Sequence, residues 1–188
     1  MIFEFDFDVT LYPTPVLRKE ATPIEAFDET LVAKVAGMFR RMYASRGVGL
    51  AAPQVGLRER ILVINPTGEA ENLDEELALV NPTITSRFGP EVIMEEGCLS
   101  FPGIYAEVKR PDGCRVEAWS PDGARHEYEF EGFTSRVIQH EYDHLQGVLM
   151  VDRMSPADKL RHRGALEELI ENYKATQLPA RPRGLFHR

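Results

Sequence analysis

Residues 139–147, with the sequence QHEYDHLQG, constrain the fold more than any other stretch of the chain. His140 and His144 are four residues apart, so on a helix both imidazoles leave from one face, about one turn apart. At this spacing, two neutral imidazole nitrogens can hold one divalent metal ion. Glu141, next to the first histidine, is then placed to act on a water bound to that metal. A solvated polar helix face is the alternative interpretation.

The flanking residues favour the metal site. The segment lies among apolar residues, so its histidines would be buried, and buried polar groups need partners. Gly132 and Gly147 fit the ends of a short helix inside a small domain. A metal ion would satisfy both histidines at once. The apolar neighbours are Phe133, Val137, Ile138, Leu145, Val148 and Leu149.

A catalytic metal site needs a third protein ligand. In one class of metalloproteases the pattern continues HExxHxxGxxH, but Met150 occupies the last position here, and methionine does not replace imidazole on such an ion. Another class uses a glutamate from a following helix, which we expect to be exposed in this chain. The glutamates available are Glu167, Glu168 and Glu171. We favour Cys98, because the preceding Gly97 lets the backbone approach a site closely.

Composition indicates one globular domain in the cytoplasm. The chain has 188 residues, of which 43% are hydrophobic, and no apolar run approaches the roughly 20 residues that span a bilayer. Residues 1–8 are acidic where a signal or transit peptide would be basic. The two cysteines, Cys98 and Cys114, need not form a disulfide in a reducing compartment. We expect no membrane association.

Charge is unevenly distributed. The formal net charge is −8, which argues against a DNA-binding protein or a generic nucleic-acid binder. Residues 153–188 nevertheless hold eight Lys and Arg against four Asp and Glu. A basic end on an acidic body indicates that this end meets an acidic partner, and a solvated helix of mixed charge is the alternative.

The order of elements predicts an α+β fold, with mostly antiparallel β-sheets packed around an internal helix that carries HExxH, and a C-terminal helix. Residues 1–176 are expected to form a single domain, and residues 177–188 a frayed basic tail. Asp28 and Ser155 are expected to cap helices over residues 29–45 and from 156 to about 173. The predicted strands span residues 3–9, 60–65, 77–81, 84–87, 104–109, 115–120 and 127–131. Turns are predicted at residues 111–113 and 121–123.

Three stretches, taken in order, resemble the motifs of the bacterial-type peptide deformylases: GVGLAAPQ at 47–54, EGCLS at 96–100 and QHEYDH at 139–144. The resemblance covers roughly residues 10–175, and three ordered motifs are far more specific than HExxH alone. It implies a metal-dependent hydrolase that removes the formyl group from the N-terminal formyl-methionine of nascent polypeptides and releases formate.

The resemblance also implies the metal and the catalytic groups. The family's native metal is Fe²⁺, and Zn²⁺, Ni²⁺ or Co²⁺ can occupy the same site. The positions that match the three protein ligands are Cys98, His140 and His144. Glu141 matches the general base, and the Gln54 side-chain amide and the Leu99 backbone N–H match the oxyanion donors.

Substrate recognition is expected to combine an extended peptide, added as a strand, with an unbranched apolar slot for the methionine side chain. The residues that match this role are Val48, Gly49, Met94, Gly97, Phe133 and Val137. Asp143 is expected to pair with an arginine and orient the helix. Tyr105 departs from the family, because many members have an arginine there, so the orientation of the peptide at this point stays open.

The basic C-terminal region gains a meaning from the family, whose bacterial members dock near the ribosomal exit tunnel through a C-terminal helix. A transient ribosome contact is therefore expected, with basic side chains facing rRNA phosphates. The candidates are Arg153, Lys159, Arg161, Arg163 and Lys174. Two other functions stay open: a zinc endopeptidase that cleaves ordinary amides, and a non-catalytic binding module. Met150 speaks against the first, and the intact Glu141 and Gln54 speak against the second.

Overall fold

The computed structural model describes residues 4–177, and within them five strands form one antiparallel sheet in the order β1-β2-β3-β4-β5. The strands are β1 Gly49–Ala51, β2 Ile61–Ile64, β3 Leu77–Gly97, β4 Tyr105–Trp119 and β5 Arg125–Glu131. The α-helices are α1 Glu29–Ala44, α2 Gly132–Leu145, α3 Met150–Arg153, α4 Pro156–Arg161 and α5 Arg163–Gln177. Short 3-10 helices are η1 Pro15–Arg18, η2 Ala52–Val55 and η3 Leu73–Glu75. The predicted α+β architecture is confirmed.

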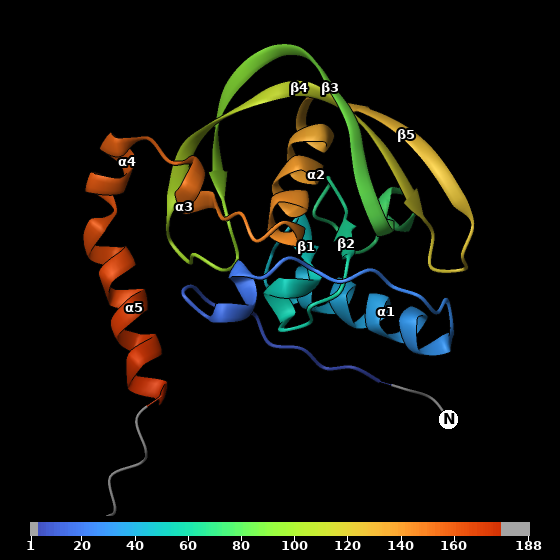
Figure 1. Ribbon diagram of the computed structural model, residues 1–188, viewed down its shortest axis with the longest axis horizontal. Helices are drawn as coiled ribbons and strands as arrows, with labels where there is room; N and C mark the ends of the chain where they lie inside the picture. Colours follow the sequence, from blue (N-terminus) through green and yellow to red (C-terminus); the bar gives the residue numbers. More distant parts are fainter. Residues whose placement is uncertain (1–3, 178–188) are drawn as a thin grey trace, which may run out of the picture.

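The helix α2 is internal, as predicted. It packs against β1, β2, β4 and β5, and the long strands β3 and β4 arch over it (Figure 1). Its boundaries fall at the expected glycines, since Gly132 and Gly147 both adopt positive φ, at 58° and 70°. At Gly147 a Cβ would lie 2.6 Å from the carbonyl oxygen of Arg18, so only glycine fits this close approach.

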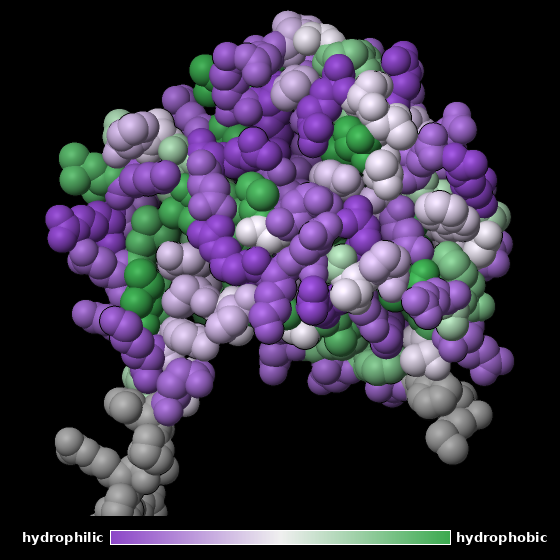
Figure 2. Space-filling model, viewed as in Figure 1, coloured by the Kyte–Doolittle hydropathy of each residue, from purple (hydrophilic) through white to green (hydrophobic). Residues whose placement is uncertain are grey.

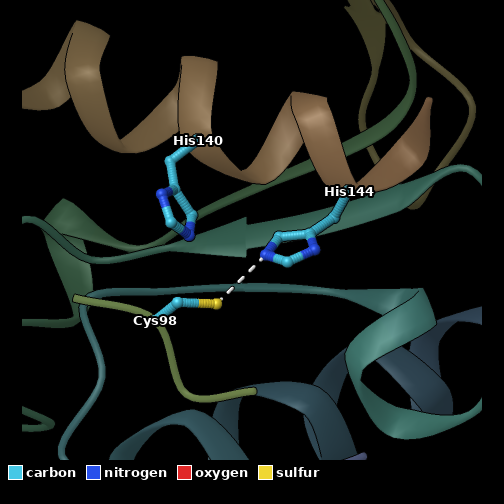
Figure 3. Close-up of side chains that lie close together, drawn as sticks. All are labelled: Cys98, His140 and His144. Carbon is cyan, nitrogen blue, oxygen red and sulfur yellow. Dashed lines mark hydrogen bonds between the residues drawn. The ribbon is translucent and has the colours of Figure 1, made fainter. Parts of the chain in front are cut away.

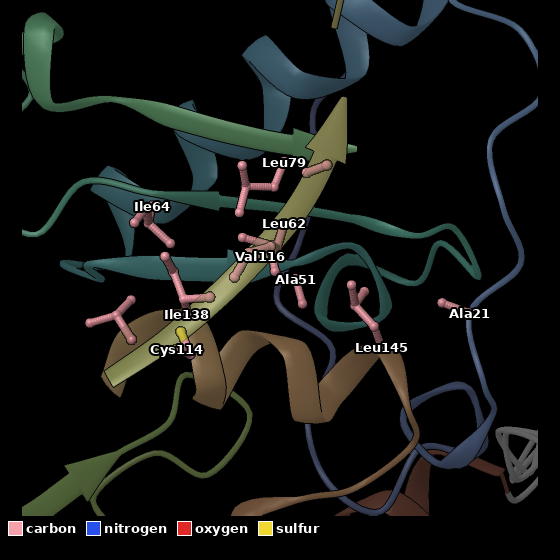
Figure 4. Packing of buried hydrophobic residues seen from close by; sticks show 11 residues of the cluster. Ala21, Ala51, Leu62, Ile64, Leu79, Cys114, Val116, Ile138 and Leu145 are labelled. Atoms are coloured by element: carbon pink, nitrogen blue, oxygen red, sulfur yellow. The ribbon is translucent and has the colours of Figure 1, made fainter. Parts of the chain in front are cut away.

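Two apolar clusters hold the sheet between helices. One lies between the sheet and α2, where Ile138 and Leu145 meet Leu62 and Leu79 (Figure 4). The other lies between the sheet and α1, whose buried face includes Met38. Asp28 caps α1 as predicted, because its Oδ1 accepts a hydrogen bond from the N–H of Leu31 at 2.9 Å. Both faces of the sheet are therefore buried, one under α2 and the other under α1, and the first contact fixes α2 relative to the strands.

The strand predicted for residues 3–9 is wrong for the residues described, because residues 4–10 have no strand partner, and residue 3 lies outside the described part. The alternating phenylalanines contact the helix α1 instead of a neighbouring strand. The carbonyl oxygen of Phe5 accepts from Arg40 Nη2 at 3.0 Å, and Phe7 packs against the α1 cluster. The phenylalanine face is therefore covered by a helix, so the segment needs no neighbouring strand.

The turn predicted at residues 111–113 is also wrong, because β4 continues through it. Pro111 pairs with Glu91 and Gly113 with Phe88, across a register shift in β3. A Cβ on Gly113 would lie 2.3 Å from the Phe88 ring, so this glycine makes room for an aromatic side chain. The strands predicted at 77–81 and 84–87 likewise merge into β3. The turn at 121–123 is confirmed, with Gly123 donating to the carbonyl of Ser120 at 2.9 Å.

The C-terminal helix is divided at His162 into α4 and α5, and α3 precedes them where none was predicted. Ser155 caps α4 as expected, accepting from the N–H of Asp158 at 3.0 Å. The helix α5 buries no residue completely, but Leu166 and Leu169 pack on a third apolar cluster. In Figure 2, apolar residues follow the side of the C-terminal helices that is turned toward the body.

Of the predicted tail, only Gln177 falls within the described residues, as the last residue of α5. The single-domain boundary at residue 176 stays a prediction. None of the helices formed by residues 4–177 combines the length and the apolar character needed to cross a membrane.

Candidate metal centre

Three side chains from two elements converge beneath α2. Cys98 follows the end of β3, and His140 and His144 project from successive turns of α2 toward it (Figure 3). Their ligating atoms all lie within 4.8 Å of one another, and Cys98 Sγ is 3.3 Å from His144 Nε2. With metal–sulfur and metal–nitrogen bonds of about 2.3 and 2.1 Å, ligand atoms of a tetrahedral ion stand about 3.6 Å apart, close to the separation of Cys98 Sγ and His144 Nε2. The donor set and its spacing fit one divalent ion.

The glutamates of α5 do not join this group. Within the described residues, the cluster able to hold a metal comprises the cysteine and the two histidines. Glu167 is instead paired with Arg163 one helical turn away, at 2.8 Å. The alternative of a glutamate ligand from a following helix is therefore wrong for this chain.

Glu96 orients the first histidine. Its Oε2 lies 2.9 Å from Nδ1 of His140, which leaves Nε2 of that ring for a metal. Burial would raise the pKa of Glu96, but hydrogen bonds from His140 and Arg110 outweigh it and hold this pKa well below its usual range. Glu96 is therefore a carboxylate that fixes the tautomer of His140.

A buried ion network surrounds Glu96. Arg110 donates through Nε and Nη2 to Glu96 at 2.7 and 3.0 Å, and through Nη1 to Asp143 Oδ2 at 2.8 Å. Arg136 Nη1 reaches Glu96 Oε1 at 2.7 Å. Asp143 also accepts two hydrogen bonds from Arg153, which agrees with the expectation that it pairs with an arginine. Sequence reasoning missed Glu96, Arg110 and Arg136 as parts of the site.

The charges around the two histidines favour a cation. Burial lowers the pKa of His144 well below its usual value, so its imidazole is neutral and offers a lone pair. At His140, burial acts in the same direction, but hydrogen bonds to Cys98 and Glu96 outweigh it and raise the pKa well above normal. The acceptors around His140 thus stabilise positive charge, which a metal ion would supply in place of a proton.

Glu141 lies beside the cluster and is buried, with one carboxylate oxygen, Oε2, that has no hydrogen-bond partner among the described residues. Burial raises its pKa from the ordinary 4.5 to about 7. A buried carboxyl with a free oxygen and a pKa near neutrality suits a group that accepts and returns a proton.

Gln54 is oriented by its backbone neighbours. Its Oε1 accepts from the N–H of Ala51 at 2.8 Å, so the amide nitrogen is the end turned toward Cys98, 3.5 Å from the sulfur. Ser100 Oγ lies 3.4 Å from the same nitrogen. Gln54 Nε2 and the Leu99 N–H, which directly follows Cys98, therefore lie close to one ligand of the cluster.

A pocket of about 640 Å³ opens beside these residues. It is lined by His140, Glu141 and Cys98 together with most of the predicted substrate positions. These are Val48, Gly49, Gly97, Phe133 and Val137. Met94 does not line this pocket; it lies on β3 with 39% of its surface exposed. Tyr105 and Arg46 also line the pocket, and the sequence had singled out only the first of them.

Fold and site together define a class of protein: α+β chains in which one internal helix and one strand end bring together a cysteine, two histidines and a buried glutamate beside a pocket. The family model for polypeptide deformylase matches residues 7–160. A Thermotoga maritima peptide deformylase is 40% identical over 168 residues, covering 89% of this chain and 99% of the relative. The crystal structure of the Plasmodium falciparum enzyme is 40% identical, with a TM-score of 0.89, covering 92% of this chain and 100% of that one.

The chain belongs to the polypeptide deformylase family. It is also 44% identical, over 179 residues, to the Arabidopsis thaliana peptide deformylase 1B, named chloroplastic/mitochondrial, covering 95% of this chain. The chain spans about 65% of the length of that plant relative and 64% of those from rice and tomato.

Proposed function

We propose that this chain is a metal-dependent hydrolase that removes the formyl group from the N-terminal formyl-methionine of nascent polypeptides and releases formate. The observation that carries the proposal is the convergence of Cys98, His140 and His144 within 4.8 Å, in a chain of the deformylase family. Glu141 beside them supplies the group that hydrolysis needs and a purely structural metal site does not.

Cys98, His140 and His144 would hold the metal, for which we propose Fe²⁺, with Zn²⁺, Ni²⁺ or Co²⁺ as substitutes. A mixed donor set of one sulfur and two nitrogens accepts several divalent ions. When bound, the ion supplies Lewis-acid activation of water and of the formyl carbonyl.

Glu141 is the proposed proton carrier. Its Oε2, which has no hydrogen-bond partner among residues 4–177, accepts the proton that the attacking water loses, and burial keeps the carboxyl ready to give that proton to the departing amine. A pKa of about 7 places both protonation states within reach at neutral pH.

Gln54 and Leu99 are the proposed donors to the carbonyl oxygen of the formyl group, on which negative charge develops. The hydrogen bond from Ala51 fixes the Gln54 amide, so its N–H groups are oriented before the substrate arrives. The backbone N–H of Leu99, which directly follows Cys98, would be the second donor.

The pocket would take the methionine side chain and the first peptide bonds. Val48, Phe133 and Val137 offer apolar surface, while Gly49 and Gly97 leave the backbone open to an added strand. Met94 is left out of this assignment, because it is not among the residues that line the pocket.

The test is formate release by protein purified without oxygen and assayed for metal. We expect one equivalent of metal and rapid release of formate from formyl-Met-Ala-Ser, with no cleavage of an internally quenched peptide. Acetyl-Met-Ala-Ser serves as the control substrate. Metal without formate release would overturn the proposal, and cleavage of the quenched peptide would favour an endopeptidase.

We also propose a transient contact of the C-terminal helices with the ribosome, in the cytoplasm. Arg161 and Arg163 already pair with Asp158 and Glu167, and Arg153 is turned inward, so the lysines at 159 and 174 are the better candidates. Charge reversal of Lys159 and Lys174 is expected to weaken cosedimentation with ribosomes at low salt. Unchanged cosedimentation would contradict this contact.

A further inference from the structure

Arg153 ends the short helix α3 and points inward. Its Nε donates to Asp143 Oδ2 at 3.0 Å and its Nη2 to Asp143 Oδ1 at 2.7 Å, so the guanidinium grips the carboxylate with two parallel hydrogen bonds. The Asp143 side chain is 8% exposed, whereas that of Arg153 is 41% exposed. A surface arginine therefore compensates a buried charge on α2, the helix that carries both histidines.

A continuous chain of short contacts runs from Arg153 to a metal ligand. Asp143 accepts from Arg110 at 2.8 Å, Arg110 donates twice to Glu96, and Glu96 contacts Nδ1 of His140 at 2.9 Å. Each of the three inner groups is buried. If one of these three groups lost its ionic partner, an uncompensated charge would remain buried.

Arg110 is shared between two carboxylates, and this sharing gives Arg153 its influence. Asp143 Oδ2 accepts from both Arg153 and Arg110. When Arg153 is removed, Arg110 becomes the remaining buried cation on Asp143, and the pull on its Nη1 grows. Because the guanidinium is rigid and planar, movement toward Asp143 draws Nε and Nη2 away from Glu96.

We propose that Arg153 is a positioning residue for the metal ligand His140, acting through Asp143, Arg110 and Glu96. The inference rests on the metal site proposed above. It connects α3, and the C-terminal helices that follow, to the geometry of the metal centre. Arg153 is not among the residues that line the pocket, so it does not act by touching the substrate.

The direction in which the rate of metal release changes distinguishes two explanations: loss of the Arg153 charge, and loss of the positioning of His140. Loss of a surface cation by Coulomb interaction alone would make the neighbourhood more negative and slow the release of a metal cation. Loss of positioning would loosen His140 and speed that release. Arg153→Lys keeps the charge but cannot form the two-pronged contact, so it also separates the two causes.

The chain contains a matched control, Arg18 of η1, that contacts the same helix α3. Arg18 pairs with Asp152, the neighbour of Arg153 on α3, and the Arg18 side chain is likewise 41% exposed. Asp152 caps α3 by accepting from the N–H of Leu149 at 2.8 Å. Arg18→Ala thus weakens the hold on α3 without touching the ion network that leads to Glu96.

The experiment measures transfer of Co²⁺ from the loaded full-length protein to excess EDTA, together with the visible spectrum of bound Co²⁺. Arg153→Ala is expected to release Co²⁺ roughly tenfold faster than wild type, since partners of metal-bound histidines typically change metal affinity by about 10–100-fold. Arg153→Lys should also release it faster, with a shifted spectrum. Arg18→Ala should stay within about twofold of wild type. At saturating Co²⁺ the KM for formyl-Met-Ala-Ser should not change.

Other outcomes for the release of the metal overturn the inference. Slower release from Arg153→Ala would assign the effect to charge, and equal acceleration in Arg18→Ala would assign it to the stability of α3. Unchanged release in both Arg153 variants would show that the network is insensitive to its outer member. If wild type bound no Co²⁺, the proposed metal site itself would be wrong, and if it bound Co²⁺ without releasing formate, the proposed reaction would be wrong while the positioning test still stood.

Discussion

A Cβ atom on Gly49 would stand 2.7 Å from Oε1 of Glu141 and 2.8 Å from Cγ1 of Val137. Gly49 lies in β1, and Glu141 lies on α2, which packs directly against that strand. Both residues are buried, Gly49 within the sheet and Glu141 on the helix packed against it. The absence of a side chain at Gly49 is therefore what gives the Glu141 carboxylate its place.

Gly49→Ala is expected to displace the Glu141 carboxylate and lower kcat for formyl-Met-Ala-Ser by about 10- to 100-fold, because misplacement of a reacting group by about 1 Å can cost that much. The measurement is kcat at saturating substrate, with metal content determined in parallel. Gly164→Ala is the control, since no atom of the described residues lies within 4 Å of its added Cβ. Full kcat in Gly49→Ala would show that the carboxylate has another position available.

Glu141→Gln is expected to change how the stability of the metal-free protein depends on pH. Burial raises the pKa of Glu141 from 4.5 to about 7, so the folded protein holds this proton more tightly than the unfolded chain. The associated stability is complete below about pH 4.5 and is lost as pH rises through about 7. A shift of this size corresponds to about 3 kcal/mol.

Urea unfolding at pH 5 and pH 8 measures this effect. The wild type should lose up to about 3 kcal/mol relative to Glu141→Gln between the two pH values, because glutamine has no proton to lose. A difference that does not vary with pH would mean that Glu141 ionises normally in the folded protein.

The two cysteines should respond differently to the same substitution. Cys98→Ser replaces the proposed thiolate ligand with a hydroxyl, so bound metal and formate release should both fall sharply. Cys114 is fully buried in the cluster between the sheet and α2, so Cys114→Ser should lower stability by about 1–3 kcal/mol and leave one metal per chain. Metal analysis and thermal unfolding distinguish the two, and retention of metal by Cys98→Ser would exclude the cysteine as a ligand.

Gln54→Glu removes the amide N–H donor of residue 54 but keeps the side-chain oxygen that accepts from Ala51. A carboxylate can still accept the hydrogen bond from Ala51 that holds the side chain, but an ionised carboxylate cannot donate to an oxyanion. We expect kcat to fall by about 100- to 1,000-fold, the usual effect of losing one such donor, with KM little changed. Unfolding midpoints provide the check that the fold is intact, and a variant with normal kcat would remove Gln54 from the proposed mechanism.

Sequence patterns predicted correctly those elements whose formation depends on interactions between residues close in sequence. The HExxH spacing and the two glycines predicted α2, and Asp28 and Ser155 predicted the starts of α1 and α4, because caps and helix faces involve neighbouring residues only. The Pro-Asp-Gly sequence at 111–113 failed as a turn signal. Its outcome depends on Phe88, which lies far away in sequence and needs the space that Gly113 leaves.

The same distinction holds in the site. Motif resemblance brought Cys98 together with the two histidines, and the structure places them in one cluster. Arg110 and Arg153 gave no such signal, because a single arginine in a strand or a short helix looks like any surface cation. The one available clue was Ala106, Val108 and Arg110 at alternate positions, which puts the arginine on the apolar face of β4. Its carboxylate partners come from β3 and α2, beyond the reach of pattern reading.

Every strand in the described sheet pairs with its neighbour in sequence, so each hairpin can close as soon as its second strand has left the ribosome. The three residues of the candidate metal centre come together later than the hairpins. Cys98 is in place once β3 and β4 have paired, but both histidines arrive only with α2, after β5 is complete. A partly synthesised copy therefore carries the proposed sulfur ligand without its proposed nitrogen partners, and a metal ion would enter a sheet that has already formed.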